Sequence, residues 1–139
     1  MRRFQTNLPE QDGRGAAVAI GNFDGVHLGH QAVIDVARAA AGASGAPLGV
    51  LTFEPHPRSF FAKKNATELP PFRLMNAEAR AHRLEKLGVE ILLELPFDQA
   101  LCDLSAWDFC KEVLSEGCGL THVVVGADFC FGKGRSGTA

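Results

Sequence analysis

Short apolar runs alternate along this chain with segments of helical character, and this alternation restricts the fold more than any other feature. Four runs have the length and composition of strands: 17–20, 49–53, 89–95 and 122–125. Three segments between them carry helical spacing or helix caps: 29–41, 77–87 and 105–116. Strands that alternate with helices form parallel sheets through right-handed crossovers. The sequence therefore predicts an α/β fold built on a parallel sheet.

The first predicted helix, residues 29–41, is identified by its apolar spacing. Val33, Val36 and Ala37 fall on one stripe, which we expect to face the sheet. Gly42 and the Gly45-Ala46-Pro47 segment are expected to end the helix, because glycine is unfavourable within a helix and favourable just beyond it.

Capping residues delimit the other two helices. Asn76 is the expected N-cap of helix 77–87, and Gly88 its C-terminal stop. Ser105 is the expected N-cap of the last helix, with an acidic residue three positions on. The stretch 54–71 contains several prolines and is predicted to be irregular.

Composition limits the classes of protein that this chain can represent. Its 139 residues, 46% hydrophobic and 22% charged, fit one globular domain, since domains average about 150 residues. The net charge of −2 provides no basic excess for nucleic-acid binding. No apolar run is long enough to cross a membrane, and no signal peptide follows the two N-terminal arginines, so we expect a cytoplasmic protein. The cysteine spacing lacks any C-x-x-C pair and favours free thiols over a zinc site or disulfides.

The first strand is followed directly by Gly-Asn-Phe-Asp-Gly-Val-His-Leu-Gly-His, residues 21–30. Glycines between a strand and a helix allow a phosphate to approach backbone N–H groups at the positive end of the helix dipole. His27 and His30, three positions apart, would project from one face and donate hydrogen bonds to phosphate oxygens. Two alternatives remain open: an inconsequential surface pair, or part of a metal site with His56 as third ligand.

The ends of the second and fourth strands also carry unusual residues. His56 lies between Pro55 and Pro57, which restrict the backbone and direct the imidazole, although a purely structural role is an alternative. Phe129 and Phe131 follow the fourth strand, and such a pair can offer one ring to a flat ligand and bury the other, although two ordinary core aromatics are an alternative. Residues 132–137 match G-x-G-x-x-G, but they do not open a helix directly after a strand, so we reject a dinucleotide fingerprint.

Three motifs, taken in order, resemble one family. G-x-F-D-G-x-H-x-G-H, T-F-E-P-H-P and V-G-A-D-F-x-F-G are typical of the N-terminal FMN adenylyltransferase module of bacterial bifunctional riboflavin kinase/FAD synthetases. The resemblance extends from about Ala16 to Gly137. It implies a Rossmann-like nucleotidylyltransferase fold with helices on both faces of the sheet, and the reaction FMN + ATP → FAD + pyrophosphate with Mg²⁺.

The resemblance also implies roles for individual residues. His27 and His30 would contact the ATP phosphates as catalytic residues, within an ATP loop that includes Gly21, Phe23, Asp24, Gly25 and Gly29. The flavin pocket would comprise Phe53, Pro55, His56, Phe61, Asp128 and Phe131. Further phosphate contacts are expected from Arg58, Lys133 and Arg135. Mg²⁺ would be held mainly by the ATP phosphates, with no metal ligand assigned to the protein. Many relatives have Asn in place of Asp128, and an ionised carboxylate, unlike an amide, only accepts hydrogen bonds.

The chemistry of this reaction suits the residues present. A phosphate monoester is already anionic at neutral pH, so it needs no general base to act as nucleophile. The protein has to align two phosphates and neutralise the charge that develops on the pyrophosphate. A cluster of His and Gly at a helix N-terminus meets that requirement without a covalent intermediate.

Family members carry a further motif, I-S-S-T-x-I-R, followed by a riboflavin kinase module, and neither occurs in the 139 residues. We therefore expect residues 1–139 to form an adenylyltransferase domain that is incomplete at its C-terminus, with a covalently linked kinase module in the parent protein. Two alternatives remain: a nucleotidylyltransferase with another phosphorylated acceptor, and a fragment that binds nucleotide or flavin without turnover.

Overall fold

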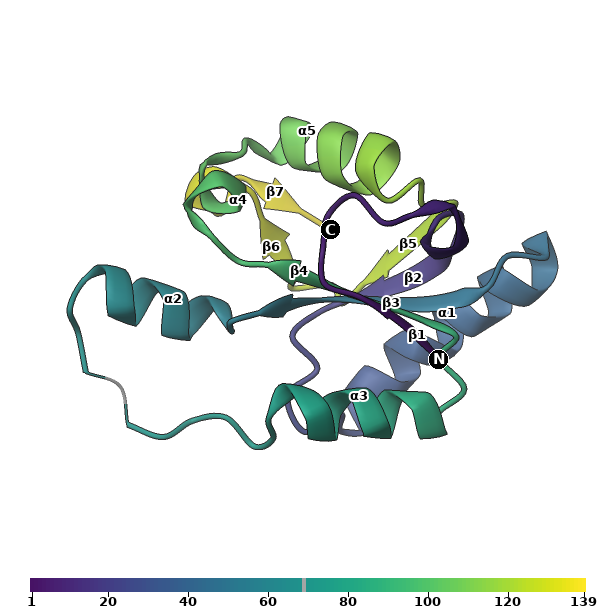
Figure 1. Cartoon of the computed structure of the whole chain (residues 1–139), viewed down its shortest axis with the longest axis horizontal. Helices are drawn as coiled ribbons and strands as arrows, with labels where there is room; N and C mark the ends of the chain where they lie inside the picture. The colour runs from purple at the N-terminus through teal and green to yellow at the C-terminus, as the bar shows by residue number, and fades with distance from the viewer. Residues whose placement is uncertain (69) are drawn as a thin grey trace.

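A five-stranded parallel sheet forms the centre of the molecule, in a computed structural model that describes residues 1–68 and 70–139 (Figure 1). The strand order is β1-β4-β3-β2-β5. The strands are β1 (Arg2–Phe4), β2 (Ala17–Ile20), β3 (Leu48–Glu54), β4 (Ile91–Pro96) and β5 (His122–Val125). The predicted parallel sheet is confirmed. The edge strand β1 was not predicted, because its three residues include two arginines and show no apolar run.

Helices cover both faces of this sheet (Figure 1). On one face lie α1 (Leu28–Ser44) and α3 (Ala77–Lys86), and on the other lie α5 (Ala106–Asp108) and its π-helical continuation Phe109–Gly117. Alternate residues of each strand serve the two cores: Ala17 and Ala19 of β2 pack with the α1 core, whereas Val18 and Ile20 pack with the π-helical segment. This alternation follows from the period of two in a strand and confirms the expected layers.

Helix α1 differs in detail from the prediction. It continues through Gly42 to Ser44 and ends at Gly45, whose φ of 71° places it in the left-handed region. A glycine inside a helix costs only about 1 kcal/mol, so it does not by itself end one. Val36 is 58% exposed, and the core side of the helix is instead occupied by Ile34, Ala37 and Ala41.

The prediction of an irregular 54–71 segment was wrong for Pro57–Lys64, which form helix α2, and Leu69 lies outside the described residues. Pro57 stands in its first turn, where proline needs no hydrogen-bond partner for its nitrogen. His56 is the N-cap, and its Nδ1 accepts a hydrogen bond from the backbone N–H of Arg58 at 3.1 Å. Another short helix, α4 (Gln99–Asp103), is capped by Asp98 and was also not predicted.

The predicted caps of the later helices are confirmed. Asn76 accepts from the backbone N–H of Ala79, and Ser105 accepts from that of Asp108. Beyond β5, the chain forms a small antiparallel pair, β6 (Cys130–Phe131) and β7 (Gly137–Thr138), joined by the 3₁₀ turn Lys133–Arg135. A second 3₁₀ turn, Gln11–Gly13, precedes β2.

Candidate active site

His27 is held by the helix that it begins. As N-cap of α1, it accepts hydrogen bonds at Nδ1 from the backbone N–H groups of Gly29, at 3.1 Å, and His30, at 3.4 Å. Because Nδ1 is the acceptor, the proton of the neutral ring lies on Nε2. The exposed ring therefore presents an N–H donor beside the positive end of a helix of 17 residues.

His30 packs directly against this ring. The two imidazoles are stacked, with centroids 3.6 Å apart and an angle of 21° between their planes. The edge of Phe23 supports His30 at a centroid distance of 5.1 Å. Burial, and then the neighbouring His27, lower the pKa of His30, against an opposing effect of Asp24. The predicted juxtaposition of the two histidines is thus confirmed, and His30 is a neutral imidazole in the free protein at pH 7.

The loop between β2 and α1 is strained. Phe23 and Val26 have φ values of 51° and 45°, although both carry a Cβ and both are buried. The carboxylate of Asp24 accepts hydrogen bonds from the backbone N–H groups of Leu74 and Met75, so it ties this loop to the segment before α3. Strain of this kind is concentrated at functional sites and persists only where the surroundings hold it.

A cavity of about 840 Å³ lies beside this loop, at the carboxyl edge of the sheet. Ligands in open parallel sheets bind at this edge. Asn22 brings the loop into contact with the cavity. Seven of the residues expected at the flavin or phosphate sites line the cavity: Phe53, His56, Arg58, Phe61, Phe131, Lys133 and Arg135. Pro55 and Asp128 are exposed and do not line it.

Phe97 completes an aromatic wall that the sequence analysis missed. Its ring meets Phe53 at 5.7 Å, Phe60 at 5.3 Å and Phe61 at 5.8 Å, in edge-to-face contacts. It follows directly after β4, so the rule that ligands bind beyond the carboxyl ends of parallel strands would have indicated it.

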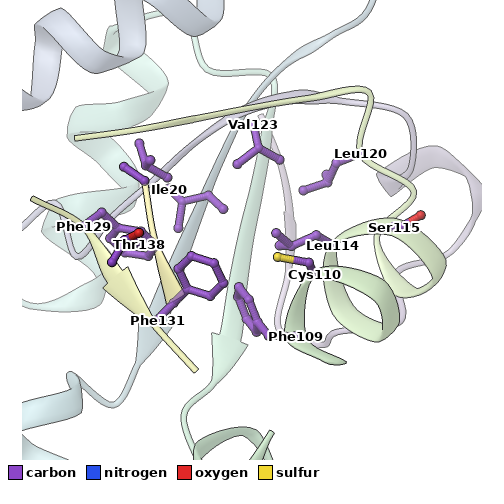
Figure 2. A pocket seen from close by; sticks show the side chains of 12 residues that line it. Ile20, Phe109, Cys110, Leu114, Ser115, Leu120, Val123, Phe129, Phe131 and Thr138 are labelled. Atoms are coloured by element: carbon purple, nitrogen blue, oxygen red, sulfur yellow. The ribbon is translucent and has the colours of Figure 1, made fainter. Parts of the chain in front are cut away.

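Phe129 and Phe131 form the opposite wall. Their rings stack at 5.8 Å, and Phe131 also contacts Phe109 at 5.6 Å. Both rings line the large cavity and also a smaller apolar one of about 390 Å³ between the sheet and the π-helical segment (Figure 2). The expected division into one ligand-facing and one buried ring is therefore not observed, because both rings stand between the two cavities.

Several basic groups line the large cavity. Arg58, Lys64, Lys133 and Arg135 line it, against the carboxyl group of Asp103. This excess of positive charge suits an anionic ligand. Burial and then Arg73 lower the pKa of His56, which leaves this capping imidazole neutral.

The described residues, 1–68 and 70–139, contain no group of three or more His, Cys, Asp or Glu side chains able to hold a metal ion. The hypothesis of a metal site built from His27, His30 and His56 therefore receives no support. All four cysteines are free thiols, as the spacing predicts. Within the described chain, no helix is long and apolar enough to span a membrane.

Together, the parallel sheet, the glycine-containing loop that leads into α1 and the cavity at the carboxyl edge define an α/β fold of the nucleotidyltransferase type. The model of the FAD synthetase family matches residues 9–139. The chain therefore belongs to the FAD synthetase family.

Curated proteins that are similar in sequence carry a description consistent with this family. A bifunctional riboflavin kinase/FMN adenylyltransferase of Pseudomonas fluorescens is 44% identical over 124 residues, which are 89% of this chain and 38% of that protein. Proteins of the same description from Haemophilus influenzae and Bacillus subtilis are 39% and 34% identical and are covered to 39% and 40%. The chain thus spans about two-fifths of the length of these relatives.

A solved structure, described as a macrolide-efflux protein from Streptococcus pneumoniae, has a TM-score of 0.76 and 28% identity to this chain. The match covers 95% of this chain and 44% of that one.

Proposed function

We propose that this chain forms the FMN adenylyltransferase module of a bifunctional riboflavin kinase/FAD synthetase, transferring AMP from ATP to FMN to give FAD and pyrophosphate. One observation carries the proposal: the aromatic cavity, which suits a flat isoalloxazine ring, reaches the histidine-bearing loop at Asn22. Aromatic side chains stack on flat rings, and the basic groups that line the cavity suit the phosphate of FMN.

The ATP phosphates would bind at the N-terminus of α1. The Nε2–H of His27 donates to a phosphate oxygen, and the helix dipole adds to the stabilisation. His30 is neutral before the nucleotide arrives, and a bound phosphate would raise its pKa and make it a stronger donor. The two rings then stabilise the negative charge that develops on the departing pyrophosphate.

The transfer itself is a direct displacement. A phosphate oxygen of FMN bonds to the α-phosphorus of ATP while the bond to the bridging oxygen of the β-phosphate breaks, and the electron pair leaves with pyrophosphate. Mg²⁺, which binds readily to phosphates, would enter with ATP and neutralise part of its charge. The protein contributes alignment and charge stabilisation, the main requirements of phosphoryl-type transfer.

FAD formation from ATP and FMN tests the proposal. We expect His27→Ala and His30→Ala each to reduce turnover by about 10²-fold or more, as loss of a transition-state donor does. His82→Ala is the matched control, because His82 is exposed on α3, outside the site. Full turnover in the two site variants would contradict the assignment of these histidines.

Two other outcomes are distinguishable in the same protein. Quenching of flavin fluorescence on mixing indicates FMN as acceptor, whereas pyrophosphate release with another phosphorylated alcohol and no quenching would favour a different acceptor. Binding of ATP and FMN by calorimetry, with no product over hours, would identify a binding fragment. The proposal includes a riboflavin kinase module in the parent protein and a cytoplasmic location, where the four free cysteines stay reduced.

A further inference from the structure

An ion network with a buried centre, formed by Arg80 and Glu94, connects to the strained loop. It contains three arginines and three glutamates: Arg3, Arg73, Arg80, Glu54, Glu78 and Glu94. At its centre, Arg80 of α3 is only 1% exposed and donates to Glu54 at 2.8 Å and to Glu94 at 3.4 Å. Burial alone would raise the pKa of Glu54, but Arg73 and Arg80 hold it below its ordinary value.

Arg80 also reaches the loop itself. Its Nη1 donates to the backbone carbonyl of Asn22 at 3.2 Å. The hydroxyl of Thr52, in β3 and fully buried, donates to the same carbonyl at 3.2 Å. Two donors from two different elements therefore fix the peptide that immediately precedes the left-handed Phe23.

We propose that Arg80 and Thr52 are positioning residues for the nucleotide-binding histidines, which they hold in place through the Asn22 carbonyl. The path is continuous: the fixed carbonyl sets the backbone at Phe23, the ring of Phe23 supports His30, and His30 stacks on His27. The role in nucleotide binding rests on the proposed function, whereas the effect on the histidine rings does not.

Stability alone does not account for this arrangement. Buried ion pairs are often no more stabilising than apolar side chains of equal volume, because desolvation offsets their attraction. The Nε of Arg80 is buried and, among residues 1–68 and 70–139, has no hydrogen-bond partner. The guanidinium group is therefore oriented so that its two Nη atoms make the hydrogen bonds, and one of these bonds holds the loop.

The same side chain connects the two halves of the site. Glu54 ends β3 two residues before His56, which lines the cavity. Arg80 thus holds the end of the cavity-side strand and the nucleotide-side loop with one planar group, a geometry that arginine provides and lysine does not.

The test compares Thr52→Val, Thr52→Ser, Arg80→Met and Arg3→Met in the full 139-residue chain. Thr52→Val removes the donor at nearly constant volume, and Thr52→Ser restores the hydroxyl. Arg3→Met is the matched control, because Arg3 joins the same network through Glu94 and Glu78 without contacting Asn22. The deciding readout is the set of ring-proton resonances of His27 and His30 and their titration, measured by NMR well below each variant's Tm.

We expect Thr52→Val and Arg80→Met to move the ring resonances and to change the pH titration of His30. Thr52→Ser and Arg3→Met should leave both close to the parent values. In FAD synthesis, kcat and kcat/KM for ATP should fall together by about tenfold or more in the first two variants, since a misplacement near 1 Å can cost 10²-fold.

Unchanged ring resonances in Thr52→Val would overturn the proposal, as would equal displacement in Arg3→Met. If Arg80→Met does not fold, the Thr52 pair decides the question, because Thr52 donates to the same carbonyl. Failure of the proposed function has a different signature: the parent chain binds neither ATP nor FMN, while its histidine resonances still respond to Thr52→Val.

Discussion

His27 has two separable tasks, and substitution by Ala and by Asn should distinguish them. One task, shown by the hydrogen bonds, is to cap α1 through Nδ1; the other, which rests on the proposed function, is to present Nε2–H to a phosphate. Asn is among the best N-cap residues, whereas Ala provides no acceptor. His27→Asn should therefore retain the stability of the helix and lose the phosphate contact, and His27→Ala should lose both.

The structure sets the size of the effect on stability. Two backbone N–H groups depend on the cap, one at 3.1 Å and one at a weaker 3.4 Å. The ring is exposed, so its removal leaves no cavity in the core. Loss of the cap should lower the free energy of unfolding by about 1 kcal/mol. For a domain of this size, that corresponds to a decrease in Tm of roughly 3–4 °C.

Thermal unfolding followed by circular dichroism, combined with FAD formation, measures the two tasks in the same samples. We expect the Tm order parent ≈ His27→Asn > His27→Ala, with both variants lacking activity to a similar degree. If His27→Asn is as unstable as His27→Ala, the capping role is wrong. If His27→Asn retains full turnover, the imidazole does not contact the phosphates.

Three further predictions follow from contacts and pKa shifts. A Cβ on Gly29 would lie 3.0 Å from Cε1 of His27, so Gly29→Ala should displace that ring and reduce ATP affinity, measured by calorimetry, while the better helix propensity of alanine offsets the weakened cap in the Tm. Burial raises the pKa of the Cys118 thiol to about 11, so Cys118 should react with a disulfide reagent only after unfolding, and rapid reaction in the native protein would contradict this. Burial holds the pKa of His30 and His56 below 6.5, so protonation favours the unfolded chain. The free energy of unfolding, measured in urea, should therefore be highest above about pH 6.5 and decline as the pH falls below that value. A profile that stays flat across this range would contradict the lowered pKa of the two histidines.

Local signals in the sequence predicted most of the elements, because caps and periodicity act over a few residues. Asn76 and Ser105 cap helices as expected, since their side chains bond the backbone three residues on. The prolines around His56 were misleading for the same local reason. Proline breaks a helix interior but favours the first turn, and sequence alone did not show that His56 supplies the cap.

Such local signals do not indicate contacts between residues that are far apart in the sequence. The hydrogen bond from Arg80 to Asn22 joins residues 58 positions apart, and that from Leu74 to Asp24 joins residues 50 apart. Neither Arg80 nor Leu74 lies in a sequence motif that indicates its partner in the loop. The residues of the loop could be predicted, but the supports that hold its strained backbone could not.

The two halves of the site meet at Asn22, and this restricts where the chemistry can occur. Of the loop residues 21–30, Asn22 alone lines the large cavity, while His27 and His30 lie on the helix side. Under the proposed function, a flavin phosphate extending from the aromatic wall and an α-phosphate bound at α1 would come into line near that residue. The carbonyl of Asn22 is held by two buried donors and points into the protein, so it offers no acceptor that would repel the two phosphates. If both proposals hold, fixing this peptide supports the histidines and also removes a partial negative charge from the place where two anions would approach.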